Sequence, residues 1–336
     1  MRSTCCLYVD TGYLLASAAT RTTGTSLRSG INVEYGKLVK ALITTAEALS
    51  GLPVLRVYWY DSATNGVPSH LQERIGELAK VKLRLGRFGF NGEQKGVDLR
   101  IGLDLVTHAR NNASDVFFLV SGDDDLTEAV EEAQVHGVQV VVLGVPNAED
   151  RPHGVNKHLI RAADDLHTID AALIDGAVIK IDRHAAPDAS CPAAESPTPA
   201  PKPGPAPAAP KPTARTPLDV ANHRSATPVP TPAPPRPSGV LAYSSSTGSS
   251  GHVMPGYDLD AHDSTIEPVV DRVLSSFLES AGPAERHEVV AARPSIPRDI
   301  DRALLIDASE ALDMDDLDEG VRHRLRAKFW ELYDAR

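Results

Sequence analysis

The chain has 336 residues, 42% of them apolar and 24% charged, which suits a soluble protein with one large domain or two smaller ones. Its apolar runs fall far short of the roughly 20 residues that a membrane-spanning helix needs, and Asp10 interrupts what would be the apolar core of a signal peptide. The net charge of −11 argues against holding duplex nucleic acid by overall charge, and three cysteines without disulfide or zinc spacing fit a reducing, cytoplasmic setting.

Apolar, strand-like runs alternate with amphipathic helical stretches through the first half of the chain. Strands are expected at residues 5–9, 54–60, 81–90, 116–120 and 139–143. Helices are expected between and after them, at residues 34–49, 68–79, 97–110 and 125–136. Apolar strands that alternate with helices predict an α/β domain of three layers over residues 1–182, with a parallel sheet covered on both faces.

The composition changes abruptly after residue 182. Residues 183–256 hold most of the chain's 26 prolines together with Ala, Ser and Thr, and such a segment cannot bury enough apolar surface to fold. We expect a disordered linker there, serving as a plain tether rather than as a docking site.

Residues 257–336 return to helical periodicity. One apolar stripe runs through Val269, Val273 and Phe277, and further helices are expected at residues 300–312 and 321–333. Because this part is acidic, it is a poor nucleic-acid surface. We expect a small, all-helical module that binds a protein partner or a second copy of the chain.

Acidic residues follow the predicted strands of the first domain. Asp10 ends the first strand, Asp61 the second, and Asp123 and Asp125 stand in the turn after residues 116–120, while Asp98 opens a helix. The carboxyl ends of parallel strands share one edge of a sheet, which is where ligands bind in such folds. Carboxylates gathered there repel one another unless a cation lies among them, and Mg²⁺ and Mn²⁺ prefer oxygen ligands. One or two such ions would allow phosphodiester hydrolysis.

Three short motifs make this interpretation more specific. They are Tyr8-Val9-Asp10, Lys95-Gly96-Val97-Asp98-Leu99 and Ser121-Gly122-Asp123-Asp124-Asp125. In this order and at these separations they resemble the NYN family of PIN-like ribonucleases over roughly residues 5–146. The resemblance implies a PIN-like fold, hydrolysis of RNA with Mg²⁺ or Mn²⁺, and metal ligation by Asp10, Asp98, Asp123 and Asp125. It also implies that Ser121 orients the acidic loop and that Asp104 has a secondary role.

Two positions depart from that family. Tyr13 stands where the family often has Asn, three residues after the first Asp, and Leu126 replaces a common Phe. Loss of a polar group at position 13 would slow catalysis or alter metal occupancy. The alternative hypothesis is a non-catalytic RNA-binding or protein-scaffolding module that keeps the fold. A metal-dependent phosphatase is a third hypothesis, although Gly12 stands where haloacid-dehalogenase phosphatases have the second Asp of their Asp-x-Asp pair.

All of these acidic positions except Asp10 also have a purely structural interpretation, whereas an apolar strand does not require the carboxylate of Asp10 at its end. Asp is favoured at helix N-caps and in first helical turns, which would account for Asp98, Asp123 and Asp125, and Asp61 could form a turn. The coincidence of three acidic positions at one sheet edge favours the metal interpretation.

A basic stretch lies near these acids in the sequence. Its candidate RNA-binding residues are Arg84, Arg87, Lys95 and Arg100, with Phe88 and Phe90 interleaved. Such residues can follow a single-stranded backbone while aromatic rings stack on bases, although they can equally form the solvent face of a strand. No phosphate-binding or dinucleotide-binding glycine pattern follows a strand, so we expect no nucleotide cofactor.

Overall fold

The computed structural model describes residues 3–63, 66–88, 94–182, 259–314 and 317–336. The tether predicted for residues 183–256 lies outside these ranges, and the domain boundaries drawn at its two ends stay predictions. Within the described ranges, no helix has both the length and the apolar character that crossing a membrane would require.

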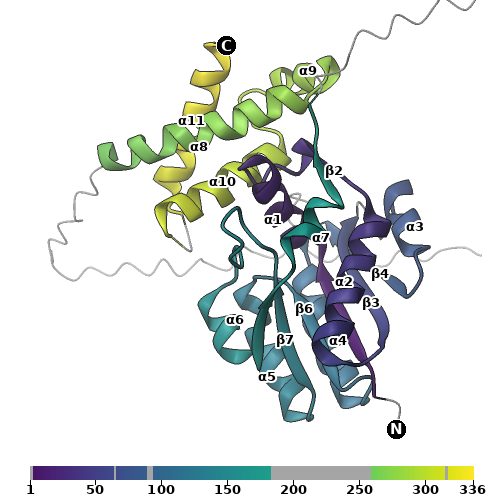
Figure 1. The fold of residues 1–336 in the computed structure, drawn as a ribbon. Helices are drawn as coiled ribbons and strands as arrows, with labels where there is room; N and C mark the ends of the chain where they lie inside the picture. The colour runs from purple at the N-terminus through teal and green to yellow at the C-terminus, as the bar shows by residue number, and fades with distance from the viewer. Residues whose placement is uncertain (1–2, 64–65, 89–93, 183–258, 315–316) are drawn as a thin grey trace, which may run out of the picture. The chain divides into compact units, whose positions relative to one another are not determined.

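A seven-stranded sheet forms the centre of the first domain, in the order β5-β4-β3-β1-β6-β7-β8 (Figure 1). Its strands are β1 (Cys5–Asp10), β3 (Val54–Ala63), β4 (Val81–Phe88), β5 (Gln94–Lys95), β6 (Val116–Val120), β7 (Gln139–Gly144) and β8 (Asp165–Thr168). All neighbouring strands pair in parallel except β5, which runs antiparallel to β4 at the sheet edge. The parallel α/β fold that the sequence predicts is thereby confirmed.

The two short edge strands were not predicted from the apolar pattern. β5 has only two residues, and β8 is mostly polar, so neither carries a run of apolar side chains. A separate antiparallel pair, β2 (Ile31–Val33) with β9 (Val178–Lys180), was also missed because each strand has three residues. Strands this short are defined by their partners rather than by their own sequence.

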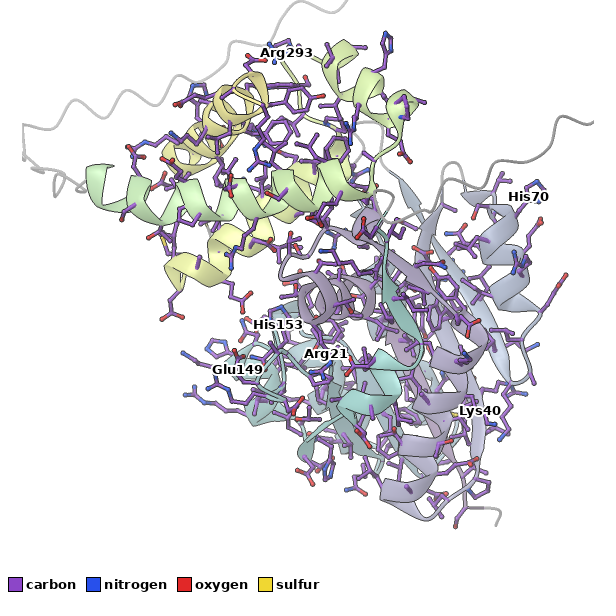
Figure 2. All side chains as sticks on the ribbon, turned by 45° about the horizontal axis from the view of Figure 1, so that its top comes forward. Arg21, Lys40, His70, Glu149, His153 and Arg293 are labelled. Atoms are coloured by element: carbon purple, nitrogen blue, oxygen red, sulfur yellow. The ribbon has the colours of Figure 1, made fainter. Side chains whose placement is uncertain are left out.

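Helices cover both faces of the sheet. Alternate side chains of β1 enter opposite layers, with Leu7 and Val9 packed in one core and Cys6 and Tyr8 in the other. The first layer is formed by α1 (Thr11–Thr23), α2 (Tyr35–Ser50), α3 (His70–Gly76) and α7 (Ala171–Asp175). The second is formed by α4 (Val97–Arg110), α5 (Thr127–Val135) and α6 (Lys157–Ala162). Lys40 and His70, labelled in Figure 2, lie exposed on the outer sides of α2 and α3.

Helix α1 was not predicted from the sequence. It begins directly after β1, with Asp10 as its N-cap, and ends at Gly24, whose left-handed backbone (φ +80°) favours glycine. Its apolar face is made largely of alanines and leucines, including the fully buried Leu14 and Ala18. The Thr and Ala content hides this face from a periodicity search, whereas the Asp N-cap and Gly C-cap are local signals that could have found it.

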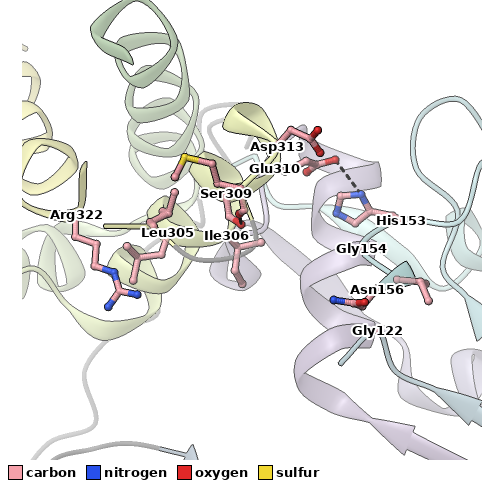
Figure 3. Close-up of a pocket in the computed structure, with 13 residues that line it drawn as sticks. Gly122, His153, Gly154, Asn156, Leu305, Ile306, Ser309, Glu310, Asp313 and Arg322 are labelled. Atoms are coloured by element: carbon pink, nitrogen blue, oxygen red, sulfur yellow. Dashed lines mark hydrogen bonds and ion pairs between the residues drawn. The ribbon is translucent and has the colours of Figure 1, made fainter. Parts of the chain in front are cut away.

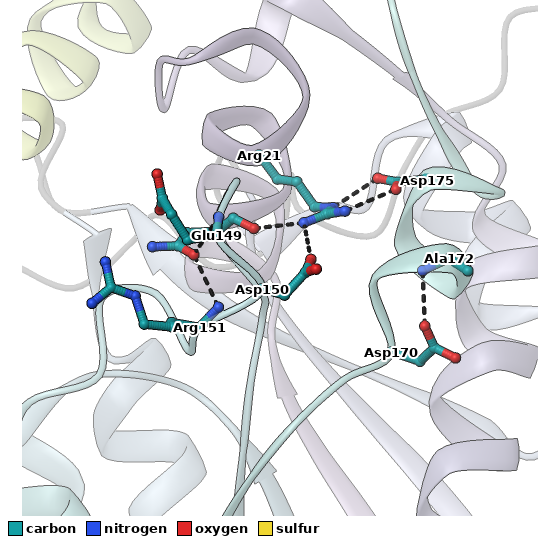
Figure 4. A network of polar contacts seen from close by, with 8 residues as sticks. Arg21, Glu149, Asp150, Arg151, Asp170, Ala172 and Asp175 are labelled. Atoms are coloured by element: carbon teal, nitrogen blue, oxygen red, sulfur yellow. Dashed lines mark hydrogen bonds and ion pairs between the residues drawn. The ribbon is translucent and has the colours of Figure 1, made fainter.

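The end of α1 is fixed by Arg21 (Figure 4). Its guanidinium makes two bonds to Asp175 of α7, at 2.7 and 2.9 Å, and a third to Asp150 at 2.9 Å. The Arg21 side chain is 13% exposed, and its charge lowers the pKa of the Asp175 carboxyl. The guanidinium of Arg21 thus joins α1 to α7 and to the loop after β7.

Two predicted helices differ from the structure at their ends. The helix expected at residues 68–79 is limited to α3, because Ser69 and Gln72 form a capping box that sets its first turn. The helix expected from residue 125 begins at Thr127, because the short 3₁₀ helix η3 (Asp124–Leu126) occupies the preceding turn. The acidic residues at positions 123 to 125 therefore stand in a separate turn ahead of α5.

The C-terminal residues form the helices α8 (Leu259–Ser280), α9 (Pro283–Ala291), α10 (Arg298–Leu312) and α11 (Glu319–Asp334). The predicted stripe through Val269, Val273 and Phe277 is buried in their shared core. That core also contains Leu27, which follows α1 in the chain and is fully buried. The described residues before and after the unplaced linker therefore belong to one compact unit.

Candidate active site

Strand pairing brings the predicted acidic residues to one edge of the sheet. Asp10 ends β1, which pairs in parallel with β6, and the acidic turn containing Asp123 and Asp125 follows directly after β6. Asp98 stands in the first turn of α4, behind Gly96, whose backbone is left-handed (φ +94°). The four residues come from three separate segments that meet at the carboxyl ends of the central strands.

Asp10 is half-buried, caps a helix and has a raised pKa. Its Oδ1 atom accepts a hydrogen bond of 2.8 Å from the backbone N–H of Gly12, which caps α1. Burial, followed by the negative charge of Asp98, raises the pKa of Asp10 from 3.8 to about 6. Asp10 therefore does cap α1. Folding nevertheless leaves its carboxyl, which is costly to ionise, near a second acid.

The other acids show the same mutual repulsion. Burial and the charges of Asp123 and Asp125 raise the pKa of Asp98. Burial and the charges of Asp125 and Asp124 raise the pKa of Asp123, although its own contact with the Asp125 N–H, at 3.1 Å, opposes this. Asp125 itself is exposed. The carboxylates lie close enough to disfavour one another's charge.

Proximity of these acids falls short of a formed metal centre. Among the residues that the structure describes, no three His, Cys, Asp or Glu side chains converge closely enough to hold a metal ion as they stand. The donor set fits Mg²⁺ or Mn²⁺ chemically, because it consists of carboxylate oxygens. Ligation would require these side chains to draw together around the ion.

The acidic turn is fixed from beneath by Ser121 and Gly122. The fully buried Ser121 accepts, through its Oγ atom, a hydrogen bond of 3.3 Å from the backbone N–H of Asp123. A Cβ atom at Gly122 would stand 1.8 Å from the carbonyl oxygen of Gly154 and 2.9 Å from the Tyr13 ring. Only glycine fits at this position, so the turn is pressed against the loop that contains Gly154.

Tyr13 supports the same loop from inside the domain. Its hydroxyl donates to the carbonyl of His153 at 2.7 Å and accepts from the N–H of Val145 at 3.2 Å. Tyr13, which departs from the family pattern, therefore fixes the backbone of the loop next to the acidic turn through two hydrogen bonds.

Asp104 and Asp61 are engaged elsewhere. Asp104 accepts a hydrogen bond of 2.9 Å from the Tyr60 hydroxyl and forms an ion pair of 3.1 Å with Arg84. Asp61 lies inside β3 rather than beyond its end, and accepts from the side chain of Gln72 at 2.7 Å. Asp61 is thus a structural partner of α3.

The candidate RNA-binding residues occupy different surroundings. Arg84 is half-buried, lies 5.7 Å from the ring centre of Tyr58 and pairs with Asp104, while Arg100 donates to the carbonyl of Leu85 at 2.5 Å. Arg87 and Lys95 face each other in the β4–β5 backbone register, and their side chains lie outside the described part of the structure. The backbone pairing therefore brings two of the predicted cations to one edge of the sheet.

A residue that was not predicted lies at the acidic cluster. The point where a Cβ would stand on Gly12 is 3.0 Å from Asp10 Oδ1 and 3.3 Å from a terminal nitrogen of Arg302, which belongs to α10. The positive charge of Arg302 partly opposes the rise in the pKa of Asp10, Asp98 and Asp123. No local motif indicates such a residue, because it lies 177 positions beyond Asp125 and after the linker.

Two hollows adjoin the cluster. The first lies between the loop around Gly154 and α10, where His153 and Glu310 approach to 3.2 Å (Figure 3). The second is a groove between α4 and α5 that begins at Asp98 and Asp125. The acids therefore stand at the end of an accessible groove.

Comparison with known proteins relates the first domain to one protein family. Residues 6–170 match the model of a family described as the NYN domain. An uncharacterized protein of Sinorhizobium fredii, y4oD, is 43% identical over 74 residues, which are 22% of this chain and 35% of that protein. The chain therefore spans about a third of the length of this relative. No solved structure gives a significant match.

Proposed function

Because residues 6–170 belong to the NYN domain family, whose fold is nuclease-like, we propose that this protein is a metal-dependent endoribonuclease. Its substrate is RNA, most simply single-stranded, and the reaction is hydrolysis of phosphodiester bonds at Asp10, Asp98, Asp123 and Asp125. The observation that carries the proposal is the placement of three half-buried carboxyls from separate segments at the carboxyl edge of the sheet, where burial and neighbouring acidic charges raise the pKa of each.

Repulsion of this kind is costly unless a cation relieves it. Folding has placed Asp10, Asp98 and Asp123 where each raises the pKa of another or has its own pKa raised by a neighbour. A purely structural cap needs one carboxylate and an N–H group, not three acids side by side. A divalent ion bound there would supply Lewis acidity and activate water for attack on phosphorus.

The chain's own residues prepare this place. The Gly12 N–H holds one oxygen of Asp10, and Ser121 holds the backbone that carries Asp123. Asp98 is carried on the first turn of α4, and Asp125 stays exposed at the mouth. Three acids are thus positioned by the fold, while the fourth is exposed.

The groove between α4 and α5 opens at the acidic cluster. It is lined by the apolar side chains of Leu99 and Leu103, which are 68% and 59% exposed, and by the acids Asp98, Asp124, Asp125, Glu128 and Glu132. Because these acids repel a phosphate backbone, the cations that contact the RNA must come from elsewhere around the cluster.

The experiment is an RNA cleavage assay with purified full-length protein. Labelled single-stranded RNA is incubated with Mn²⁺, with Mg²⁺ or with EDTA, and a phosphomonoester is tested in parallel. The wild type is compared with Asp98→Asn and with Glu149→Gln, a matched control in which an exposed carboxyl outside the cluster is neutralised. We expect metal-dependent cleavage that Asp98→Asn abolishes and Glu149→Gln retains.

Other outcomes would point to the alternative functions. Absence of RNA cleavage with every metal would overturn the proposal and favour a non-catalytic RNA-binding or scaffolding module. Release of phosphate from the monoester alone would indicate a phosphatase. Cleavage that persists in Asp98→Asn would show that the acidic cluster is not the active site. A cytoplasmic location and a protein partner for the C-terminal helices remain separate proposals, tested by fractionation and by solution mass measurement.

A further inference from the structure

Helix α10 is anchored to the NYN domain next to the acidic cluster. The segment after α1 enters the helical core, with Thr25, Ser26 and Leu27 all buried. The backbone N–H of Ser26 donates to Asp307 of α10 at 3.0 Å, and the Ser26 hydroxyl donates to the carbonyl of Ala303 at 3.4 Å. A buried hydrogen bond to a carboxylate inside an apolar core indicates a permanent attachment rather than a loose lid.

A second contact fixes the same helix farther along. The Nδ1 atom of His153 lies 3.2 Å from a carboxylate oxygen of Glu310 (Figure 3). The carbonyl of His153 accepts a hydrogen bond from the Tyr13 hydroxyl. These anchors attach to Ala303, Asp307 and Glu310, which leaves the first turns of α10 at a defined place beside the NYN domain. Arg302 lies in this anchored stretch.

The absence of a side chain at Gly12 leaves room for Arg302. Gly12 offers no Cβ, and the point where that atom would stand lies 3.3 Å from an Arg302 terminal nitrogen and 3.0 Å from an Asp10 oxygen. The guanidinium therefore approaches the first turn of α1 from the helical module. It reaches the same corner of the sheet as the three acids.

Two more arginines stand beside Arg302. Arg298 lies four residues earlier on α10, which puts both on one face of the helix, and it lines a depression together with Ser29. Arg28 comes from the NYN domain itself, next to Ser29. Burial, followed by the charge of Arg28, lowers the pKa of Arg302, while the charges of Asp10 and Asp98 oppose this. The three guanidiniums form what we call the arginine cluster: Arg28, Arg298 and Arg302.

The juxtaposition of an acidic and an arginine cluster has a chemical consequence. Four carboxylates, one divalent ion and three guanidiniums leave a small net positive charge at this corner, and a phosphate group is the complementary ligand. Guanidinium groups bind phosphate through paired N–H donors and stabilise charge on it. Arg84, from the predicted basic stretch, pairs with Asp104 rather than with the acidic cluster.

We propose that Arg302 belongs to the active site of the NYN domain, where its guanidinium, flanked by Arg28 and Arg298, binds a phosphate of the RNA chain. The active site is then composite, because the acids come from the N-terminal domain and two of the three cations from the C-terminal helices. This inference rests on the proposed function for the identity of the ligand. The competing view is that Arg302 is a counterion that blocks the metal site.

The test measures RNA binding separately from cleavage. Fluorescence anisotropy with a short single-stranded RNA is recorded at several salt concentrations with full-length protein, in Ca²⁺, a hard cation that carboxylate oxygens bind, and in EDTA for comparison. The variants are Arg302→Gln, Arg302→Lys and the control Arg336→Gln, which removes an arginine at the C-terminal end of the same helical module. Thermal unfolding of each variant shows that the helices stay attached.

We expect Arg302→Gln to weaken binding about tenfold or more, since a hydrogen-bonded charged contact is removed. The dependence of log affinity on log salt should become shallower by about 0.7, which is the value for one phosphate contact on a single strand. Arg302→Lys should keep the salt dependence but bind more weakly, because it keeps the charge and loses the paired donors. Arg336→Gln should behave as the wild type.

Several results would overturn the inference. They are unchanged affinity and salt dependence in Arg302→Gln, no RNA binding by the wild type, or tighter Mn²⁺ binding and faster cleavage in Arg302→Gln, which would identify a blocking counterion. If the wild type cleaves no RNA but Arg302→Gln still loses affinity with a shallower salt dependence, the phosphate site stands and only the proposed catalytic function fails.

Discussion

The substitution Asp10→Asn measures how strongly the carboxyls oppose one another without metal. Burial and the charge of Asp98 raise the pKa of Asp10 from 3.8 to about 6. A carboxyl whose pKa is raised by folding stabilises the fold fully below its unfolded pKa, and this contribution is lost as the pH rises through the folded pKa. The metal-free wild type should therefore lose stability between about pH 4 and about pH 6, and the Asn variant should lose less, because it lacks the contribution of Asp10.

The size of the effect follows from the two pKa values. One pKa unit corresponds to about 1.4 kcal/mol, so the change from 3.8 to about 6 gives at most about 3 kcal/mol at neutral pH. Solvent screening of this half-buried group reduces the expected gain of Asp10→Asn to about 1–2 kcal/mol. Asn can still accept the Gly12 N–H through its side-chain oxygen, so the cap of α1 is kept.

Urea unfolding in EDTA, followed by circular dichroism, provides the assay. At about pH 4 or below the variant and the wild type should be nearly alike, and at about pH 7.5 the variant should be more stable. Adding Mn²⁺ should reverse the order, because only the intact site gains the free energy of metal binding. The control Glu149→Gln should show neither effect. Equal stability of Asp10→Asn and wild type at neutral pH would refute the electrostatic reasoning.

Further substitutions test the elements around the site by chemical or thermal unfolding. Leu27→Ala should cost about 2–5 kcal/mol because Leu27 is fully buried in the helical core, whereas Leu49→Ala, at a side chain 42% exposed, should cost less than about 1 kcal/mol. Tyr13→Phe should cost about 1–3 kcal/mol through the two lost backbone bonds, and an unchanged melting temperature would contradict this role. Gly122→Ala should cost about 3 kcal/mol or more and weaken Mn²⁺ binding in calorimetry, since its Cβ would meet the Gly154 carbonyl at 1.8 Å. Asp307→Asn should equal or exceed wild-type stability at neutral pH, because burial raises the pKa of Asp307, whereas Asp307→Ala should lose about 1–3 kcal/mol with the bond from Ser26.

The sequence by itself determined the parallel α/β class and most of its elements. The strands β6 and β7 and the helix α4 are bounded as expected, apart from one residue at the end of β7. The two strands are continuous apolar runs, and the apolar residues of α4 repeat with the helical period. It also indicated which acids to compare, since a carboxylate after a strand lies at the ligand-binding edge of a parallel sheet. Helix α1 was missed because its apolar face of small residues gives a weak periodic signal.

Only the tertiary structure decided which charges meet. Asp10 and Asp61 look alike in the sequence because each follows an apolar strand, yet Asp61 bonds to Gln72 while the charge of Asp98 raises the pKa of Asp10. Tyr13 reads as a lost polar group until its hydroxyl is found on the backbone of His153 and Val145. Arg302 joins the acids through the burial of Leu27 among distant helices. Local propensity and periodicity act over a few residues, whereas these contacts arise from packing between segments far apart in the chain, which no short window of sequence encodes.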